Sequence, residues 1–127
     1  MSFTLMDLGS ENLEFRASVW NWKTALEIIK SFDIISEGKI RQMSYNATGT
    51  SVSNEEAHQI GKQIAENILP KMAPEKRIFG DLTITDKPDD GTLYRDQDEQ
   101  WKNFSAEFEW LSDFSGFCLS SKGFQVF

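Results

Sequence analysis

Aromatic side chains are concentrated at the C-terminal end of this chain, and that concentration limits the ways in which the chain can fold. The 27 residues from Trp101 to Phe127 hold eight of the sixteen Phe, Trp and Tyr residues in the sequence. Each aromatic side chain removes on the order of 150–250 Å² of surface from water when it is buried. The segment is therefore expected either to form the main element of the core or to contribute to a binding surface.

The length and the cysteine content favour one folded unit in a reducing compartment. A chain of 127 residues has the size of one typical domain, about 100–150 residues, and a single globular domain over residues 1–127 is predicted. Cys118 is the only cysteine, so no internal disulfide can form. Neither a signal peptide nor a segment of roughly 20 apolar residues is recognisable. We therefore expect a cytoplasmic protein that does not bind membranes.

The charge pattern argues against one class of partner and favours another. The formal net charge is −7, and the basic residues are scattered along the chain. Direct binding to nucleic acid requires a basic stripe that displaces counterions from phosphates, so no nucleic-acid partner is expected. An acidic surface can steer a basic protein partner. It can equally serve solubility alone.

A strand and a helix are predicted one after the other near the N-terminus. In residues 13–19 apolar and polar side chains alternate, which predicts a strand with one buried face. From about Asn21 to Ile35 the apolar side chains share one side of a helical wheel, which predicts an amphipathic helix. Asn21 or Ser18 is the candidate N-cap of this helix. The stretch from Gly38 to Gly49 is expected to be irregular.

A capping box gives the strongest local signal. Ser53 at the N-cap and Glu56 three residues later can each accept a hydrogen bond from the other's backbone amide. They predict a helix to about Leu69, ended by Pro70. On one side of this helix three small residues lie four positions apart, namely Ala57, Gly61 and Ala65. We expect a large aromatic side chain of the C-terminal helix to pack into the groove that they form.

The remaining elements complete an α+β fold. Residues 78–85 are predicted to form a second strand, and an acidic loop follows from Asp86 to Glu99. The last helix is predicted from about Asp98 to Ser121, and residues 124–127 are a candidate third strand. Three main helices are therefore expected to pack on a small antiparallel sheet.

The predicted C-terminal helix has a wider apolar surface than one core contact needs. A surface helix needs a stripe of about 100°, whereas Trp110 and Phe117 widen the apolar arc of this helix to roughly 220°. One interpretation is a central helix covered on both sides. The other is an exposed patch at Trp110 and Phe117 that binds a partner, because Trp is enriched at interface hot spots.

Glu107 lies inside this apolar arc, and a buried carboxylate is costly unless it is paired. Three interpretations remain open. Glu107 can lie at the solvent edge of the arc, it can pair with an arginine, or it can be an acid in a ligand pocket. The candidate arginines are Arg16, Arg41 and Arg77.

Most catalytic chemistry is excluded by residue types and spacing. His58 is the only histidine, and no Cys and His spacing suits a metal. No Gly-x-Ser-x-Gly motif presents a serine nucleophile. A calcium-loop pattern beginning at Asp86 fails at Pro88 and at Gln97. Cys118 lies on the apolar arc and is expected to be a small core residue. No catalytic residue, no metal and no cofactor is therefore predicted.

Four short motifs carry a resemblance to other proteins. They are Trp20-Asn-Trp22 at a helix start, Asn46 to Gly49 with Val52-Ser53 and Glu56-Ala57, Trp110-Leu-x-x-Phe114-x-x-Phe117, and the Gly-Phe-x-Val pattern of residues 123–126. In these motifs the chain resembles a group of small uncharacterised bacterial proteins. The resemblance implies a bacterial, cytoplasmic origin and transfers no activity or functional residue.

The favoured hypothesis is a non-enzymatic, acidic protein-binding module, of the inhibitor or immunity type, for a basic partner. Its candidate binding residues are Trp110, Phe117 and Trp20 for apolar contact, and Asp89, Asp90, Asp96 and Asp98 for steering. One alternative is an enzyme or small-ligand binder with a pocket around Glu107, completed by Tyr94, Trp101 or Arg95. Another is a homo-oligomeric structural protein that buries the excess aromatic surface by self-association.

Overall fold

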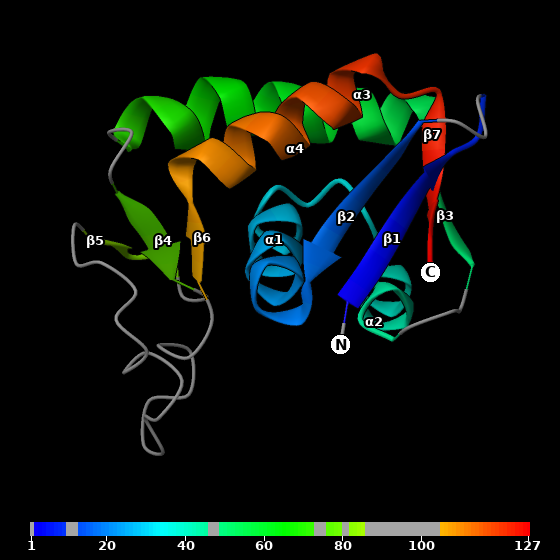
Figure 1. The fold of residues 1–127 in the computed structure, drawn as a ribbon, viewed down its shortest axis with the longest axis horizontal. Helices are drawn as coiled ribbons and strands as arrows, with labels where there is room; N and C mark the ends of the chain where they lie inside the picture. The colour runs from blue at the N-terminus through cyan, green and yellow to red at the C-terminus, as the bar shows by residue number, and fades with distance from the viewer. Residues whose placement is uncertain (1, 10–12, 46–48, 73–75, 80–81, 86–104) are drawn as a thin grey trace.

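The chain has an α+β fold in which helices and two antiparallel sheets surround one hydrophobic core (Figure 1). The computed structural model describes residues 2–9, 13–45, 49–72, 76–79, 82–85 and 105–127. This part contains four α-helices and two sheets, so the predicted fold class is confirmed, while the predicted three main helices and single small sheet are too few. No helix in the described ranges is long and apolar enough to cross a membrane.

Two of the helices agree closely with the sequence signals. Helix α1 spans Val19–Ser31, and the Ser18 side chain caps it by accepting a hydrogen bond from the Asn21 amide. It ends before the predicted Ile35 because Asp33 adopts a left-handed conformation with φ 57°. Helix α3 spans Asn54–Gln63 and begins with the complete capping box of Ser53 and Glu56.

After Gln63 the helical path continues with altered geometry. A π-helical turn covers Ile64–Ile68, and a 3₁₀ turn covers Leu69–Lys71. Pro70 lies in that last turn, where its missing amide hydrogen ends the regular hydrogen bonding. The predicted end of the helix near Leu69 is therefore close to the observed one.

Helix α2, Glu37–Met43, was not predicted, since residues from Gly38 onward were expected to be irregular. The helix is short, and Ser36 caps it by accepting a hydrogen bond from the Lys39 amide. Ile40 and Met43, three residues apart, are its buried side chains. Two apolar positions in seven residues are too few for a periodicity argument, which explains the omission.

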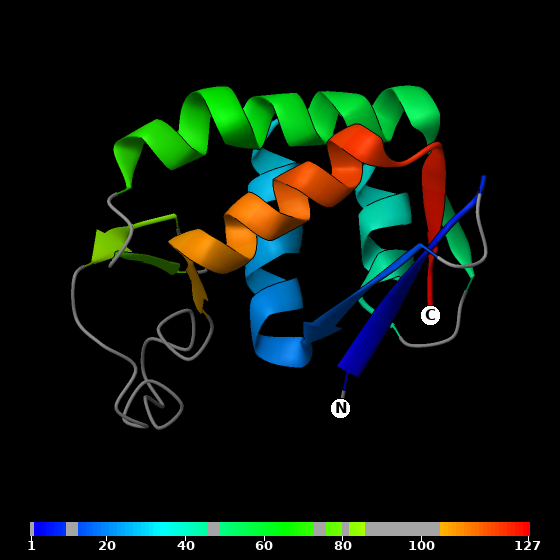
Figure 2. The ribbon, with the colours of Figure 1, turned by 45° about the horizontal axis from the view of Figure 1, so that its top comes forward.

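Helix α4, Phe108–Ser120, begins about ten residues later than predicted. Residues 105–107 form a strand instead, and residues 98–104 lie outside the described part of the chain. Helices α3 and α4 lie side by side across the top of the molecule, with α1 beneath them (Figures 1 and 2).

The contact between α3 and α4 is close because Gly61 has no side chain. The Ser115 hydroxyl donates a hydrogen bond to the Gly61 carbonyl at 2.8 Å. A Cβ atom added to Gly61 would lie 2.8 Å from Leu119 Cγ and 3.1 Å from Cys118 Cβ. The nearest neighbours at Gly61, the middle residue of the predicted groove, are thus Ser115, Cys118 and Leu119, so the prediction of a large aromatic side chain was wrong at this position. Small residues on both helices permit the approach.

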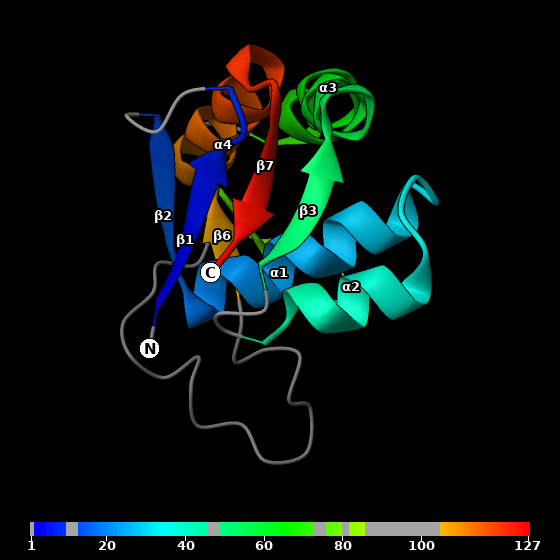
Figure 3. The same ribbon diagram turned by 90° about the vertical axis from the view of Figure 1, so that its right-hand side faces the viewer.

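The larger sheet has the strand order β2-β1-β7-β3, and each neighbouring pair is antiparallel. Its strands are β1 (Ser2–Asp7), β2 (Glu14–Ser18), β3 (Thr50–Ser53) and β7 (Gly123–Val126). Figure 3 shows the four strands side by side, with β2 and β3 at the two edges. The predicted strands at 13–19 and 124–127 are confirmed here, while β1 and β3 were missed.

The smaller sheet has the order β5-β4-β6. Its strands are β4 (Arg77–Phe79), β5 (Ile84–Thr85) and β6 (Ser105–Glu107). Residues 78–85 were predicted as one strand but form a hairpin, because Leu82 turns the chain with φ 72° and donates its amide to the Phe79 carbonyl. Consequently the predicted strands at 78–85 and 13–19 belong to two different sheets.

Aromatic rings from three elements pack together, from the edge of the core at Phe15 and Trp110 to its interior at Trp22 and Phe114. Phe15 of β2 contacts Trp110, Phe114 and Phe117 of α4, with ring centroids 5.6, 5.7 and 5.6 Å apart. Trp22 of α1 contacts Phe114 edge to face at 5.9 Å. Helix α4, which carries three of the C-terminal aromatic residues in these contacts, is therefore a core element that packs against both the larger sheet and α1.

Candidate functional site

The smaller sheet contains the two strands that flank residues 86–104, the part of the sequence that includes the acidic segment. Residues 86–104 connect β5 to β6, and both strands pair with β4. Arg77 of β4 lies opposite Thr85 on one side and Glu107 on the other. The two strands that flank residues 86–104 in the sequence therefore lie on opposite sides of one short strand.

Arg77 and Asn21 hold the return point, Ser105, in place. Arg77 donates from Nε and Nη2 to the Ser105 hydroxyl at 3.1 and 2.8 Å. Asn21 of α1 donates from Nδ2 to the Ser105 carbonyl at 3.1 Å. The first turn of α1 is thereby fixed to Ser105, the first described residue after the acidic segment and six positions beyond its last acidic residue, Glu99.

Trp20 lies in this first turn of α1, one residue before Asn21, and its side chain is 38% exposed. Trp22, two positions further, is fully buried and donates from Nε1 to the Met43 carbonyl at 2.9 Å. Side chains two positions apart on a helix point to nearly opposite sides. Trp22 is therefore a core residue, whereas Trp20 is exposed and directly precedes Asn21, the residue bonded to Ser105.

Glu107 is exposed, whereas the pocket hypothesis required its carboxylate to be buried. Its side chain is 56% exposed and forms an ion pair with Arg77 at 3.7 Å between Oε2 and Nη1. The solvent-edge and Arg77-pairing interpretations both describe this arrangement. The helical wheel placed Glu107 inside the apolar arc only because residues 105–107 were assumed to be helical, and they form a strand. A ligand pocket around a buried Glu107 carboxylate therefore loses its basis.

Phe117 is a core residue, so the predicted exposed patch of Trp110 and Phe117 needs correction. Phe117 is 7% exposed, and its ring lies 5.6 Å from those of both Phe15 and Phe124. Strands β2 and β7 cover the flank that the helical wheel left open. Trp110 is half-buried, contacting the Phe15 ring at 60° and stacking on Phe114 at 5.4 Å. Of the two, only Trp110 keeps exposed surface.

The predicted steering residues, Asp89, Asp90, Asp96 and Asp98, lie outside the described residues, as do Tyr94, Arg95 and Trp101. The charge can still be divided from the sequence. The described residues include 11 acidic and 10 basic side chains, a net charge of −1. The other −6 of the total −7 belongs to the remaining residues. The described framework is thus almost neutral.

The thiol and imidazole groups have ordinary structural environments. Cys118 is fully buried, and this burial raises the pKa of its thiol far above the usual range, so a reactive thiolate is not available. His58 lies on the exposed side of α3. Among the described side chains no group of three or more His, Cys, Asp and Glu could hold a metal ion.

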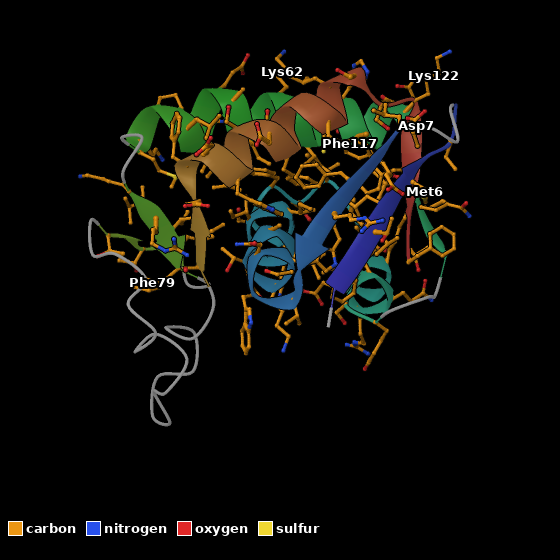
Figure 4. The ribbon with its side chains drawn as sticks, viewed as in Figure 1. Met6, Asp7, Lys62, Phe79, Phe117 and Lys122 are labelled. Atoms are coloured by element: carbon orange, nitrogen blue, oxygen red, sulfur yellow. The ribbon has the colours of Figure 1, made fainter. Side chains whose placement is uncertain are left out.

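Asp7 is a buried polar residue that the sequence analysis missed. It is 8% exposed, and its Oδ1 accepts hydrogen bonds from the Ser121 hydroxyl and the Lys122 amide, both at 2.8 Å. Its Oδ2 accepts from the Gly9 amide at 2.9 Å. Asp7 and Lys122 lie together at the end of β1, far from Phe79 of β4 (Figure 4). Asp7 therefore joins the β1–β2 hairpin to the end of α4, a structural role that the period-two pattern of Phe3, Leu5 and Asp7 could have indicated.

No protein-family model, curated protein or solved structure matches this chain. The class that can be stated is an α+β protein with two antiparallel sheets in its described part. Its function has to be argued from its own residues.

Proposed function

We propose that this protein is a non-enzymatic protein-binding module that recognises a basic protein partner through Trp20 and the acidic segment 86–99. The observation that carries this proposal is the position of Trp20. Its indole is 38% exposed, and its neighbour Asn21 is hydrogen-bonded to Ser105, where the chain returns from the acidic segment. An exposed apolar residue is therefore next in sequence to the residue that holds Ser105, the first described residue after the acidic part of the sequence.

The charge distribution supports the same region. Residues 86–99 contain six acidic side chains and two basic ones, Lys87 and Arg95, a net charge of −4. The described framework adds only −1. A basic partner would thus be attracted mainly toward the acidic segment. Such attraction raises the association rate more than the affinity, and it weakens as salt screens the charges.

Trp20 would supply the affinity in this scheme. Trp is among the residues most enriched at interface hot spots, because its large rigid ring buries much surface at little entropic cost. Phe117 no longer qualifies for this role because it is buried. A small acidic module that covers a basic site on its partner is suited to the work of an inhibitor or immunity protein, by analogy of charge alone.

The test is affinity capture on the immobilised protein at low and at high salt, followed by identification of the bound proteins. The intact chain should retain basic proteins at low salt and release them at high salt. Trp20→Ala, and separately Asn at positions 89, 90, 96 and 98, should each remove the same bound proteins. Phe127→Ala is the matched control, since Phe127 is a similarly exposed aromatic (41%) at the end of β7.

Two results would contradict the proposal. One is a set of bound proteins that is acidic or insensitive to salt. The other is equal retention by the intact chain and by Trp20→Ala, since this would remove Trp20 from the interface.

A further inference from the structure

The two edges of the larger sheet differ in their capacity to pair with another strand. At the β3 edge the Ser53 amide already donates to Glu56 Oε1 at 2.9 Å, as part of the helix cap. Gly49, with φ 69°, donates its amide to the Val126 carbonyl, although Val126 is also the partner of Thr50. Gly49 and Thr50 thus both face Val126, which is the arrangement of a β-bulge. A bulge interrupts the regular hydrogen bonding of an edge strand. The β3 edge is therefore poorly suited to pairing with another strand.

The β2 edge keeps its backbone groups available. The Asp7 amide donates to the Leu13 carbonyl, so in the alternating pattern residues 13, 15 and 17 of β2 are hydrogen-bonded to β1. The amides and carbonyls of Glu14 and Arg16 consequently point away from the sheet. Within the described part of the chain these groups have no hydrogen-bond partner. In Figure 3, β2 is the outermost strand of its sheet.

The order of charges along the β2 edge allows two copies of this edge to pair with opposite charges facing each other. Glu14 and Arg16 flank Phe15, and their side chains lie on the outer face of the sheet, 40% and 79% exposed. An edge with charges of one sign would repel a second copy. In an antiparallel pair centred on Phe15, however, Glu14 of each copy lies opposite Arg16 of the other. Opposite charges in directly facing positions stabilise a strand pair, and like charges destabilise it.

We propose that two copies of this chain associate through β2, antiparallel and centred on Phe15, so that their two larger sheets form one continuous sheet. This register joins the outward amides and carbonyls of Glu14 and Arg16 in four backbone hydrogen bonds across the two-fold axis. Centring the pair on Glu14 or on Arg16 would place identical charges opposite each other. Among the registers centred on Glu14, Phe15 and Arg16, only the one centred on Phe15 therefore places opposite charges face to face.

The same interface accounts for the remaining exposed surface of Trp110. Its ring lies 5.6 Å from that of Phe15, at the edge of the core, and is half-buried. In the proposed register the two Phe15 residues face each other as a pair without direct hydrogen bonds, where strands approach most closely. The second copy would therefore cover the edge of the Phe15–Trp110 contact. This surface is separate from Trp20, so the dimer does not depend on the proposed function.

The experiment is size-exclusion chromatography with light scattering, from micromolar to near-millimolar concentration. The intact chain should approach twice its mass of 14.5 kDa as concentration rises. Arg16→Glu converts both cross-strand pairs from attraction to repulsion and should raise the dimer dissociation constant about tenfold or more. Glu14→Arg should do the same. The exchange of both charges, Glu14→Arg with Arg16→Glu, should restore the dimer.

A backbone variant and a control complete the test. Arg16→Pro removes an outward amide that β1 does not use, so it should weaken the dimer while the monomer stays folded. Trp20→Ala should leave the dimer unchanged, which separates this interface from the proposed partner site. A monomer at every concentration would overturn the proposal. So would a dimer that persists unchanged in Arg16→Glu and Arg16→Pro, or one that the double exchange fails to restore.

Discussion

The substitution Gly61→Ala tests whether the closeness of α3 and α4 determines stability. The added Cβ would lie 2.9 Å from the Ser115 carbonyl oxygen and 2.8 Å from Leu119 Cγ. The end of the Leu119 side chain can rotate away, but the Ser115 carbonyl oxygen is part of the backbone and can move only if α4 moves. Forcing such overpacking costs typically about 1–3 kcal/mol. Loss of the hydrogen bond from Ser115 to the Gly61 carbonyl adds about 1 kcal/mol.

The helix preference of alanine opposes this loss of stability and has to be subtracted from it. Alanine is favoured over glycine in a helix by about 1 kcal/mol, so Gly61→Ala should lower the free energy of unfolding by about 1–3 kcal/mol in total. Gly116→Ala is the matched control, because Gly116 is an exposed residue of α4 and an added Cβ meets nothing within 4 Å. At Gly116 only the helix preference of alanine acts, so the free energy of unfolding of this variant should rise by up to about 1 kcal/mol.

The assay is urea unfolding followed by tryptophan fluorescence, with the free energy taken from the midpoint and the slope. With a slope of roughly 1–3 kcal/mol per molar urea, the two variants should move the midpoint in opposite directions by easily measured amounts. If Gly61→Ala is as stable as the intact chain, or is stabilised as much as Gly116→Ala, the helices do not need this close contact and the reasoning fails.

Two further predictions concern titratable groups. Burial raises the Glu56 pKa, but hydrogen bonds from the Ser53 amide and Lys39 and the Lys39 charge outweigh it, so the pKa lies below 4.5. The carboxylate therefore stabilises the fold above about pH 4.5, and this stabilisation is lost as pH falls through the folded-state pKa. Glu56→Gln should flatten the acid dependence of the urea midpoint, and an unchanged acid dependence would argue against this linkage. The buried Cys118 thiol should resist a thiol reagent at mildly alkaline pH in the folded protein and react fully in urea. Fast labelling of the folded protein would show that the site opens.

The sequence predicted best the elements that carry their own local signals. The Ser53–Glu56 box is satisfied within one turn, so it needs no knowledge of the rest of the chain. Helix α1 has a full apolar side over several turns, and its Ser18 cap was one of two candidates. The strand at 14–18 shows its alternation in only five residues, yet it is clear because its polar positions are charged.

The errors arose where tertiary pairing decides the conformation. Strand β6 was taken as helix because aromatic residues on either side have helical spacing, whereas β4 supplies the hydrogen bonds that make residues 105–107 extended. This error moved Glu107 into the apolar arc of a helical wheel, and the pocket hypothesis started from that burial, whereas the Glu107 side chain is exposed. The pairing of β4 with β5 depends on a positive φ at Leu82. This conformation is unusual for leucine, so the residue type did not predict it.

The candidate site was predicted in part for a similar reason. Trp20 could be proposed from its residue type, and its exposure distinguishes it from Trp22 two positions away. Phe117 could not be separated from Trp110 on a wheel, because that distinction depends on where β2 and β7 pass. Asp7 was overlooked because Ser121 and Lys122, the partners that tie it to the end of α4, lie more than 110 residues further along the chain.

The pairing of β1 with β7 also bears on how the protein is made. Leu5 faces Val126, a residue 121 positions later, and this ladder lies in the middle of the larger sheet. On a ribosome, the β1–β2 hairpin emerges early but cannot join β3 until β7 has been synthesised and inserted between them. Its apolar face must wait until more than 100 further residues have been translated, which extends the period in which chaperones can bind it and misfolding can compete.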